Sequence, residues 1–430
     1  MMREKLDSRL GFLMLTAGCA VGLGNVWRFP FVVGRNGGAA FVLVYLLMLA
    51  LFGFPLLLAE LAVGRGGGAG VVGAFRRLGG RNWARVGYAV FAGNLLLMVY
   101  YTDVAGWLMK FAGSYALSGA PPEFAELVAD RPTCLAFMLA AVAAASAACA
   151  AGVRRGVERA TKWMMLALLA LMGVLAANAL SLDGAAKGLS FYLRPDWKPL
   201  LEHPGRVVFE AMGQAFFTLS VGVGAMTAFG SYARRRESLV KEAALVVAID
   251  TFVAFCSGLV VFAACATYGV DVTCGPGLIF AALPRAFAAM PCGRIWGFAF
   301  FLFLSLAALT TVVAVFECLV GGLAEEWRRG RAASSAAVGA AVAALSLPCV
   351  FVDGVLEAED LVFSKFWLPS GGLAFALFVS WGFGWGWEGF RREASAGRGA
   401  ALPGWTRHVF RYVVPALIVL VVAGGLAWRN

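Results

Sequence analysis

The stretch "AGCAVGLGN", residues 17 to 25, interrupts an apolar run that extends from Leu10 to Val33, and it contains three glycines. Glycine is a poor helix former and adopts backbone conformations that other residues avoid. If the run crosses a membrane, this break lies near mid-depth. Backbone N–H and C=O groups outside a helix are tolerated there only inside protein or around a cavity. The break therefore predicts a binding site for a solute.

The composition is that of a membrane protein. Of the 430 residues 61% are hydrophobic and 14% are charged, and the mean hydropathy is +0.80. A bilayer core needs about 20 consecutive apolar residues per helix, and we predict an all-α polytopic membrane protein in which residues 1–430 form one transmembrane domain. Its eleven predicted spans cover residues 10–33, 39–64, 86–114, 132–151, 160–181, 207–231, 242–269, 294–323, 333–352, 366–387 and 409–428.

The net charge of +11 follows from topology. With the N-terminus in the cytoplasm, 24 of the 36 Lys and Arg residues fall on the internal side and 12 on the external side. Cytoplasmic loops of membrane proteins carry such an excess of basic residues. The distribution predicts an internal N-terminus and an external C-terminus, and it argues against a nucleic-acid partner.

The sixth predicted span contains a second break, "FFTLSVGVGAM" at residues 216 to 226. Glycines in membrane helices also serve close helix packing, but both breaks lie beside side-chain oxygens, those of Asn25 and of Thr218 and Ser220. Because five spans separate the breaks, the second half enters the membrane from the opposite side, as in the inverted repeats of transporters. We predict repeats at residues 10–181 and 207–387, with helices 1 and 6 unwound at mid-membrane, and an accessory helix at 409–428.

Six motifs extend this interpretation. They are "AGCAVGLGNVWRFP" (17–30), "NGGAAF" (36–41), "GFPLLLAELAVGR" (53–65), "GQAFFTLSVGVGAM" (213–226), "GPGLIFAALP" (275–284) and "LAALTT" (306–311). In type, order and spacing the chain resembles the bacterial neurotransmitter:sodium symporters, which resemble the leucine transporter. The resemblance implies sodium-coupled amino acid symport by alternating access, with spans 1, 2, 6 and 7 rocking against the remaining helices, in the bacterial cytoplasmic (inner) membrane.

The two breaks suit an amino acid zwitterion. Exposed N–H groups of a half-helix attract an anion, and free carbonyls accept hydrogen bonds from a cation. The amides of Leu23 and Gly24 would hold the carboxylate, and the carbonyls of Ala20 and Phe217 the amine. The resemblance adds the Tyr101 hydroxyl. The full predicted substrate set is Cys19, Ala20, Leu23, Gly24, Leu97, Tyr101, Phe217, Thr218, Ser220, Val223, Thr311 and Val315.

The walls of this predicted pocket carry no charge, which favours a neutral hydrophobic amino acid. Val223 stands where the leucine-selective relative has a phenylalanine, so we expect room for an aromatic side chain. Since a methylene changes the binding free energy by only about 1–3 kcal/mol, broad selectivity is expected.

The resemblance also implies two sodium ions, carried as cargo with no other cofactor. Sodium, a hard cation, takes oxygen ligands. The first site would use the Ala20 carbonyl and the side chains of Asn25, Thr218 and Asp250. The second would use the carbonyls of Gly18, Val21 and Ala307 and the hydroxyls of Thr310 and Thr311.

Asp250 is a carboxylate within a predicted span, with no Lys or Arg one helical turn away in sequence. Such a charge requires a cationic companion, and sodium would supply it. Animal relatives use chloride at a site that includes a serine where this chain has Ala254. We therefore predict transport that is independent of chloride.

Gates are implied by the same resemblance. Arg28 would pair with Asp360 above the substrate, although Asp353 and Glu357 compete for that role. At the internal side Arg3 would pair with Glu325, near Tyr232. The predicted gate residues are Arg28, Asp360, Arg3, Glu325 and Tyr232.

Several residues depart from the family pattern or stand apart from it. Leu6 replaces a tryptophan, and Leu166 replaces a proline that would help span 5 unwind. Asp103 is an acid where an apolar residue is expected, and it either pairs with a nearby cation or titrates and couples protons. The other intramembrane acids, Glu60 and Glu317, are interpreted as hydrogen-bonded structural groups. Cys274 and Cys292 flank an external loop and are candidates for a disulfide.

Enzymatic chemistry is not expected, because His203 and His408 lie in predicted loops without a nucleophile or metal-ligand spacing. Two alternatives to sodium symport remain: a proton-coupled transporter of the same architecture, and a sensor that binds an amino acid without moving it. The expected partners are an amino acid, sodium and the lipid bilayer, with no obligate protein partner.

Overall fold

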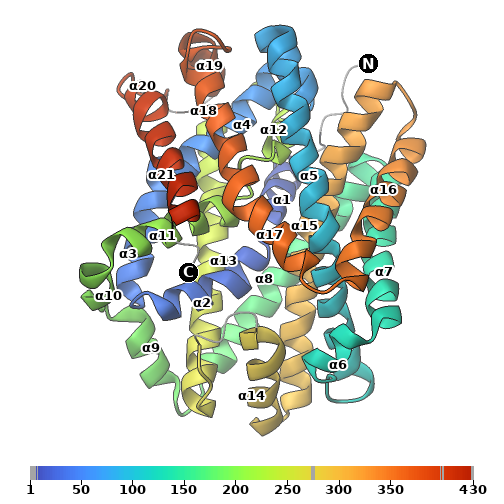
Figure 1. Cartoon of the computed structure of the whole chain (residues 1–430), viewed down its shortest axis with the longest axis vertical. Coiled ribbons are helices and arrows are strands. Elements are labelled where there is room, and N and C mark those ends of the chain that lie inside the picture. Colours follow the sequence, from blue (N-terminus) through green and yellow to red (C-terminus); the bar gives the residue numbers. More distant parts are fainter. Residues whose placement is uncertain (1–5, 7, 273–276, 398, 400, 428–430) are drawn as a thin grey trace.

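The computed structural model describes residues 6, 8–272, 277–397, 399 and 401–427, and it is helical throughout (Figure 1). The helices of the first half are α1 (Arg9–Ala20), α2 (Phe29–Arg35), α3 (Ala39–Met48), α4 (Phe54–Gly67), α5 (Val71–Leu117), α6 (Phe124–Ala129), α7 (Arg131–Ala150), α8 (Arg159–Leu180), α9 (Ala185–Leu193) and α10 (Lys198–Glu202). Those of the second half are α11 (Pro204–Thr218), α12 (Ala225–Gly230), α13 (Leu239–Tyr268), α14 (Leu283–Ala289), α15 (Gly293–Trp327), α16 (Arg331–Phe351), α17 (Val355–Val362), α18 (Leu368–Ser380), α19 (Trp387–Ala394), α20 (Thr406–His408) and α21 (Val414–Ala427).

Wider π-helical turns precede six of these helices and run directly into them. They are Gly24–Arg28, Leu49–Gly53, Val153–Glu158, Leu278–Ala282, Phe363–Trp367 and Val409–Val413. Five of them lead into helices with a proline in the first two positions, α2, α4, α14, α18 and α21. Proline has no N–H and clashes with the carbonyl four residues before it, so widening the preceding turn relieves the clash while the span continues.

The first predicted break is confirmed. Helix α1 ends at Ala20, Val21 is extended with φ −69° and ψ 101°, and helical structure resumes at Gly24. The two halves of the span are bent by 52°. The peptide groups between them are buried, so they must find partners other than the helical ones.

The sixth predicted span is also broken. Helices α11 and α12 contain 15 and 6 residues and are separated by residues 219–224, where Ser220, Gly222 and Gly224 have φ of +50°, +100° and +73°. Neither piece reaches the roughly 20 residues that a span needs. Within the described residues, nine single helical stretches and one bent pair are long and apolar enough to cross a bilayer, compared with the predicted eleven.

Gly222 shows why glycine is required at this second break. Its φ lies in the left-handed region, and a Cβ built there would overlap the carbonyl oxygen of Leu368 in the next segment of the bundle. We expect Gly222→Ala to lower the free energy of unfolding by about 1–3 kcal/mol, measured by thermal unfolding in detergent. Gly113→Ala in α5 is the control, because its Cβ meets nothing within 4 Å; equal destabilisation by both variants would contradict this account.

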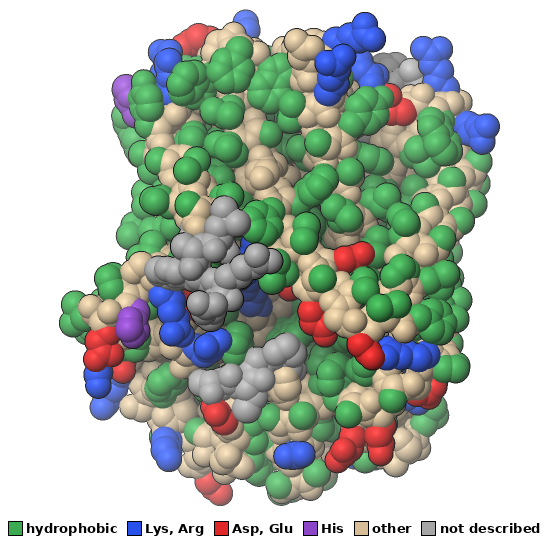
Figure 2. All heavy atoms as spheres, viewed as in Figure 1, with side chains coloured by type: hydrophobic (Ala, Val, Ile, Leu, Met, Phe, Trp, Pro, Cys, Tyr) green, Lys and Arg blue, Asp and Glu red, His purple; other side chains and the backbone are tan. Residues whose placement is uncertain are grey.

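The broken segments lie inside the molecule. Helix α1 packs against α8, α13 and α15, and α12 packs against α4 and α15. Figure 1 shows α1 and α12 surrounded by the longer helices, with α6, α9 and α14 at one end and α19 and α20 at the other. Figure 2 shows Lys and Arg gathered at the end that carries α19, hydrophobic side chains over the region next to it, and both acidic and basic side chains farther toward the other end. Helix α8 runs unbroken through Leu166, as expected without a proline there.

Candidate functional site

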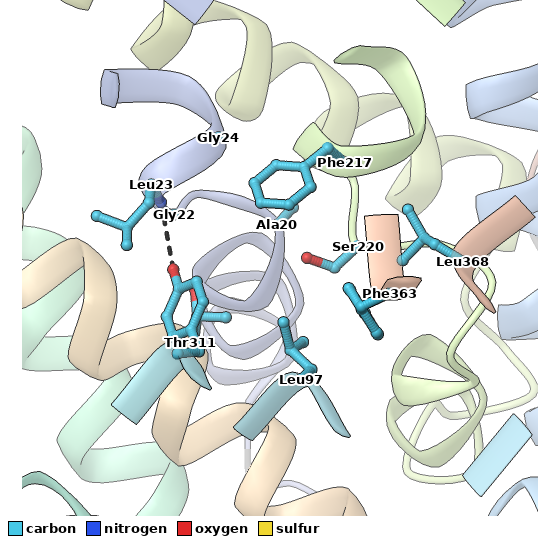
Figure 3. Close-up of a pocket in the computed structure, with 11 residues that line it drawn as sticks. Ala20, Gly22, Leu23, Gly24, Leu97, Phe217, Ser220, Thr311, Phe363 and Leu368 are labelled. Carbon is cyan, nitrogen blue, oxygen red and sulfur yellow. Dashed lines mark hydrogen bonds between the residues drawn. The ribbon is translucent and has the colours of Figure 1, made fainter. Parts of the chain in front are cut away.

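The two breaks face each other across one pocket, and helix α5 completes its wall (Figure 3). The cavity is small, about 20 Å³, so a bound amino acid must displace some of the lining side chains. The lining residues are Ala20, Gly22, Leu23, Gly24, Leu97, Tyr101, Phe217, Ser220, Thr311, Phe363 and Leu368.

Most of the predicted substrate residues lie in this lining. The exceptions are Cys19, Thr218, Val223 and Val315. Each of these four is fully buried behind the wall. Cys19 contributes its backbone instead, because its carbonyl accepts a hydrogen bond of 3.1 Å from the Ser220 hydroxyl, which ties the two breaks together.

Three lining residues are not among the predicted substrate residues: Gly22, which lies within the first predicted break, and Phe363 and Leu368. Phe363 and Leu368 lie at the junction of α17 and α18, where the sequence predicts only the start of a span. The proline at position 369 was the available signal, because it marks a wide turn that brings the chain close to Gly222.

Backbone amides at the first break have side-chain partners. The Gly22 N–H donates to the Asn25 side chain over 3.0 Å, and the Leu23 N–H donates to the Tyr101 hydroxyl oxygen over 3.2 Å. Because the Tyr101 oxygen accepts in this bond, its own O–H remains able to donate to an anion. The site therefore presents polar groups to a ligand although its walls are largely apolar.

Asp250 lies at the centre of the second cluster. Its carboxylate accepts hydrogen bonds from the Asn25 amide over 2.8 Å and from the Thr218 hydroxyl over 2.9 Å. All three residues are fully buried. Over the described ranges no Lys or Arg forms an ion pair with Asp250. The structure thus brings together three members of the predicted first sodium site, beside the end of α1 where Ala20 lies.

The predicted second sodium set also converges. The Thr311 hydroxyl lies 3.4 Å from the Gly18 carbonyl and 3.3 Å from the Ala307 carbonyl, and the Thr310 hydroxyl lies 2.9 Å from the latter. Helix α15 thereby contacts the last turn of α1. The predicted ligand Val21, the first residue after α1, is buried. Oxygen atoms of this kind suit a hard cation.

Glu60 and Glu317 are confirmed as hydrogen-bonded groups. The Gly222 N–H donates a hydrogen bond of 2.5 Å to the Glu60 carboxylate, and this bond links the second break to α4. Glu317 accepts from the Tyr232 hydroxyl over 2.6 Å and forms an ion pair with Arg331. The two acids thus stabilise backbone and loop positions around the site.

The predicted Arg28–Asp360 ion pair is absent from the structure. The Arg28 guanidinium lies over the Phe217 ring, 5.0 Å from its centre. Asp360 accepts a hydrogen bond of 2.9 Å from Ser364 in its own helical segment, so the two groups have different partners. Of its predicted competitors, Asp353 pairs with Arg131 instead.

At the internal gate, Arg3 lies outside the described residues, so its predicted pair with Glu325 does too. Glu325 accepts from the Gly70 N–H over 3.1 Å, and Tyr232 has Glu317 as a partner, which the sequence did not predict. Leu6 is buried, and its carbonyl accepts from Arg234. Cys274 also lies outside the described residues, and with it the candidate disulfide to Cys292.

An all-helical membrane protein in which two interrupted helices meet at one pocket has the architecture of a secondary transporter. The sodium:neurotransmitter symporter family model matches residues 3–120 and 126–428. The chain is 31% identical to an uncharacterised sodium-dependent transporter of Bacillus subtilis, and the match covers 96% of each protein. It is 29% identical to an uncharacterised sodium-dependent transporter of Haemophilus influenzae, and that match covers 99% of this chain and 98% of the relative. The crystal structure of MhsT in complex with L-phenylalanine matches with a TM-score of 0.87 and 34% identity, covering 98% of this chain and 100% of MhsT.

The chain belongs to the sodium:neurotransmitter symporter family. It is accordingly a sodium-dependent, multi-pass membrane transporter and not an enzyme.

Proposed function

We propose that this protein imports a neutral hydrophobic or aromatic amino acid together with sodium, without chloride. The proposal rests on the surroundings of the Asp250 carboxylate. This buried carboxylate accepts hydrogen bonds from Asn25 and Thr218 between the two breaks, and no cationic side chain in the described part of the chain forms an ion pair with it. An isolated buried charge is very unfavourable, and a sodium ion bound by the same oxygens would remove the penalty.

The substrate class follows from the pocket wall. Leu97, Phe217, Phe363 and Leu368 are apolar, while Tyr101 offers a donor for a carboxylate. MhsT, whose structure is similar, was crystallised with L-phenylalanine. An α-amino acid with an uncharged side chain fits both the apolar and the polar parts of such a wall.

Chloride independence rests on the same carboxylate. Ala254 has no hydroxyl to offer an anion, and it lies one helical turn after Asp250 in α13. An anion next to the ionised Asp250 would be repelled. The fixed negative charge therefore takes over the balancing role that chloride has in animal relatives.

We infer the membrane topology that alternating access would require. We propose eleven spans, with α11 and α12 together forming the sixth, inverted repeats at residues 10–181 and 207–387, and an accessory helix at 409–428. The protein would lie in the bacterial cytoplasmic membrane with its N-terminus inside. The first-site sodium ligands and the substrate share the first break, so sodium and substrate should raise each other's affinity by the same factor.

Uptake in proteoliposomes tests the proposal. Labelled phenylalanine, leucine and a charged amino acid are supplied with an inward sodium gradient, and sodium is replaced by choline in a parallel set. We expect accumulation of the two neutral substrates only with sodium. Uptake driven equally well in choline by an inward proton gradient would favour the proton-coupled alternative, for which the buried Asp103 carboxyl is the specific observation.

Replacing Tyr101 by Phe is expected to lower substrate affinity roughly tenfold, because one hydrogen bond to a charged group contributes about 1.5 kcal/mol. Sodium dependence should persist. The measurement is the substrate concentration that gives half-maximal uptake. Tyr115→Phe in the same helix is the matched control, since the buried Tyr115 hydroxyl has no hydrogen-bond partner among the described residues. Similar losses in both variants would rule out a specific role for Tyr101.

A further inference from the structure

A second cavity lies between α5, α7, α16 and the start of α17. It has a volume of about 40 Å³, which is enough for at least one water molecule. Asp103 of α5 lines it, two residues after Tyr101. Residues two apart point to different sides of a helix, so this cavity is separate from the substrate pocket, and none of its lining residues belongs to that pocket.

The Asp103 carboxyl group in this cavity is unpaired. The residue is only 2% exposed, and neither carboxylate oxygen has a hydrogen-bond partner within the described part of the chain. Of the two possibilities for Asp103, pairing with a nearby cation is therefore not seen among the described residues. Arg131, the one basic residue in the lining, is bound to Asp353 and to the Val350 carbonyl instead.

The other groups around the cavity make a second negative charge unfavourable. The ionisable groups that face Asp103 are Arg131 and Cys134 from α7, Cys349 from α16, and Asp353, Glu357 and Glu359 from α17 and the turn before it. The Cys349 thiol donates to Glu359 over 3.3 Å, and Glu359 interacts electrostatically with Asp103. Three carboxylates thus accompany a single guanidinium. No metal-binding group of three His, Cys, Asp or Glu residues occurs in the described ranges.

The rim gives solvent a way in. The Asp353 side chain is 85% exposed and Glu357 is exposed, and both line the cavity. A hydronium ion at the rim can therefore transfer its proton to a carboxylate oxygen of Asp103 and become water. The proton returns to water by the same path.

We propose that Asp103 is a proton-binding site of the transporter, filled from this solvent-facing rim. The loss of its proton places a negative charge opposite Glu359 and pushes α17 away. Helix α17 runs directly into the turn that carries Phe363 of the substrate pocket. Proton release at Asp103 thereby weakens substrate binding. This coupling rests on the proposed function, but the binding of a proton by Asp103 does not depend on it.

Infrared difference spectroscopy of the purified protein in nanodiscs tests proton binding without any transport. Raising the pH should remove a carbonyl stretch of a buried carboxylic acid. The Asp103→Asn variant should lack this band, and Asp103→Glu should show it at a shifted frequency. Glu126→Gln, which removes an exposed carboxylate of α6 that does not line the cavity, should keep it unchanged. A wild-type band that persists in Asp103→Asn overturns the proposal, and if that variant does not fold, an unshifted band in Asp103→Glu has the same consequence.

Substrate uptake tests the coupling. Between mildly acidic and mildly alkaline external pH, wild-type sodium-driven uptake should fall several-fold, while Asp103→Asn should stay near the acidic wild-type level. Glu126→Gln should follow wild type. Uptake that falls equally in Asp103→Asn overturns the coupling. If the protein takes up no amino acid with sodium but the infrared band is present, the proposed function is wrong and the proton site is still supported.

Discussion

Uptake by the Asp250→Asn variant is expected to fail in chloride-free medium, whereas wild-type uptake should be equal in chloride and in gluconate. The substitution keeps the size of the side chain and hydrogen-bonding atoms for Asn25 and Thr218, but it removes the negative charge. Because ligand charge tunes cation affinity over orders of magnitude, we expect the half-maximal sodium concentration to rise at least about tenfold, which is about 1.4 kcal/mol.

A second substitution makes this result specific. In the double variant Asp250→Asn with Ala254→Ser, chloride should restore part of the uptake, because an anion can then replace the missing charge and gains a hydroxyl donor. Sodium titrations with and without chloride measure the effect. Strict chloride dependence of the wild type, or full activity of Asp250→Asn in gluconate, would show that Asp250 does not balance the sodium charge.

Gly22→Ala is expected to abolish most transport while the protein still folds. A Cβ at this position would lie 2.8 Å from the Tyr101 hydroxyl and 2.9 Å from the Thr311 hydroxyl. Both oxygens would have to move, one from the substrate pocket and one from the predicted second sodium site. Overpacking of this kind costs about 1–3 kcal/mol, so substrate and sodium affinities should each drop roughly 10- to 100-fold.

Binding of phenylalanine at several sodium concentrations, followed by a thermal shift, measures both losses at once. Gly173→Ala in α8 is the control, because its added Cβ meets nothing within 4 Å. Unchanged binding by Gly22→Ala would mean that the first break does not approach α5 and α15 as closely as the structure shows.

Much of the site could be predicted because its determinants are local. The two breaks are fixed by glycines within short stretches, 17–25 and 216–226, and each stretch disrupts a helix wherever it is placed. The residues of the predicted sodium sets, such as Thr310 and Thr311, lie in motifs that could be matched directly. In contrast, Phe363 and Leu368 contribute to the pocket through a turn whose position depends on contact with Gly222.

The sequence by itself determined that this protein crosses a membrane repeatedly, that two of its spans are interrupted, and that a carboxylate at position 250 lies among apolar residues. Such properties depend on composition and on neighbours in the chain. Only the tertiary structure decided which charges meet. It places Arg28 over an aromatic ring, bonds the Tyr232 hydroxyl to Glu317, and gives the Asp103 carboxyl no hydrogen-bond partner among the described residues. Partners of this kind come from helices far apart in the sequence, and hydrogen bonds and ion pairs act over a few ångströms, which only the packing of those helices sets.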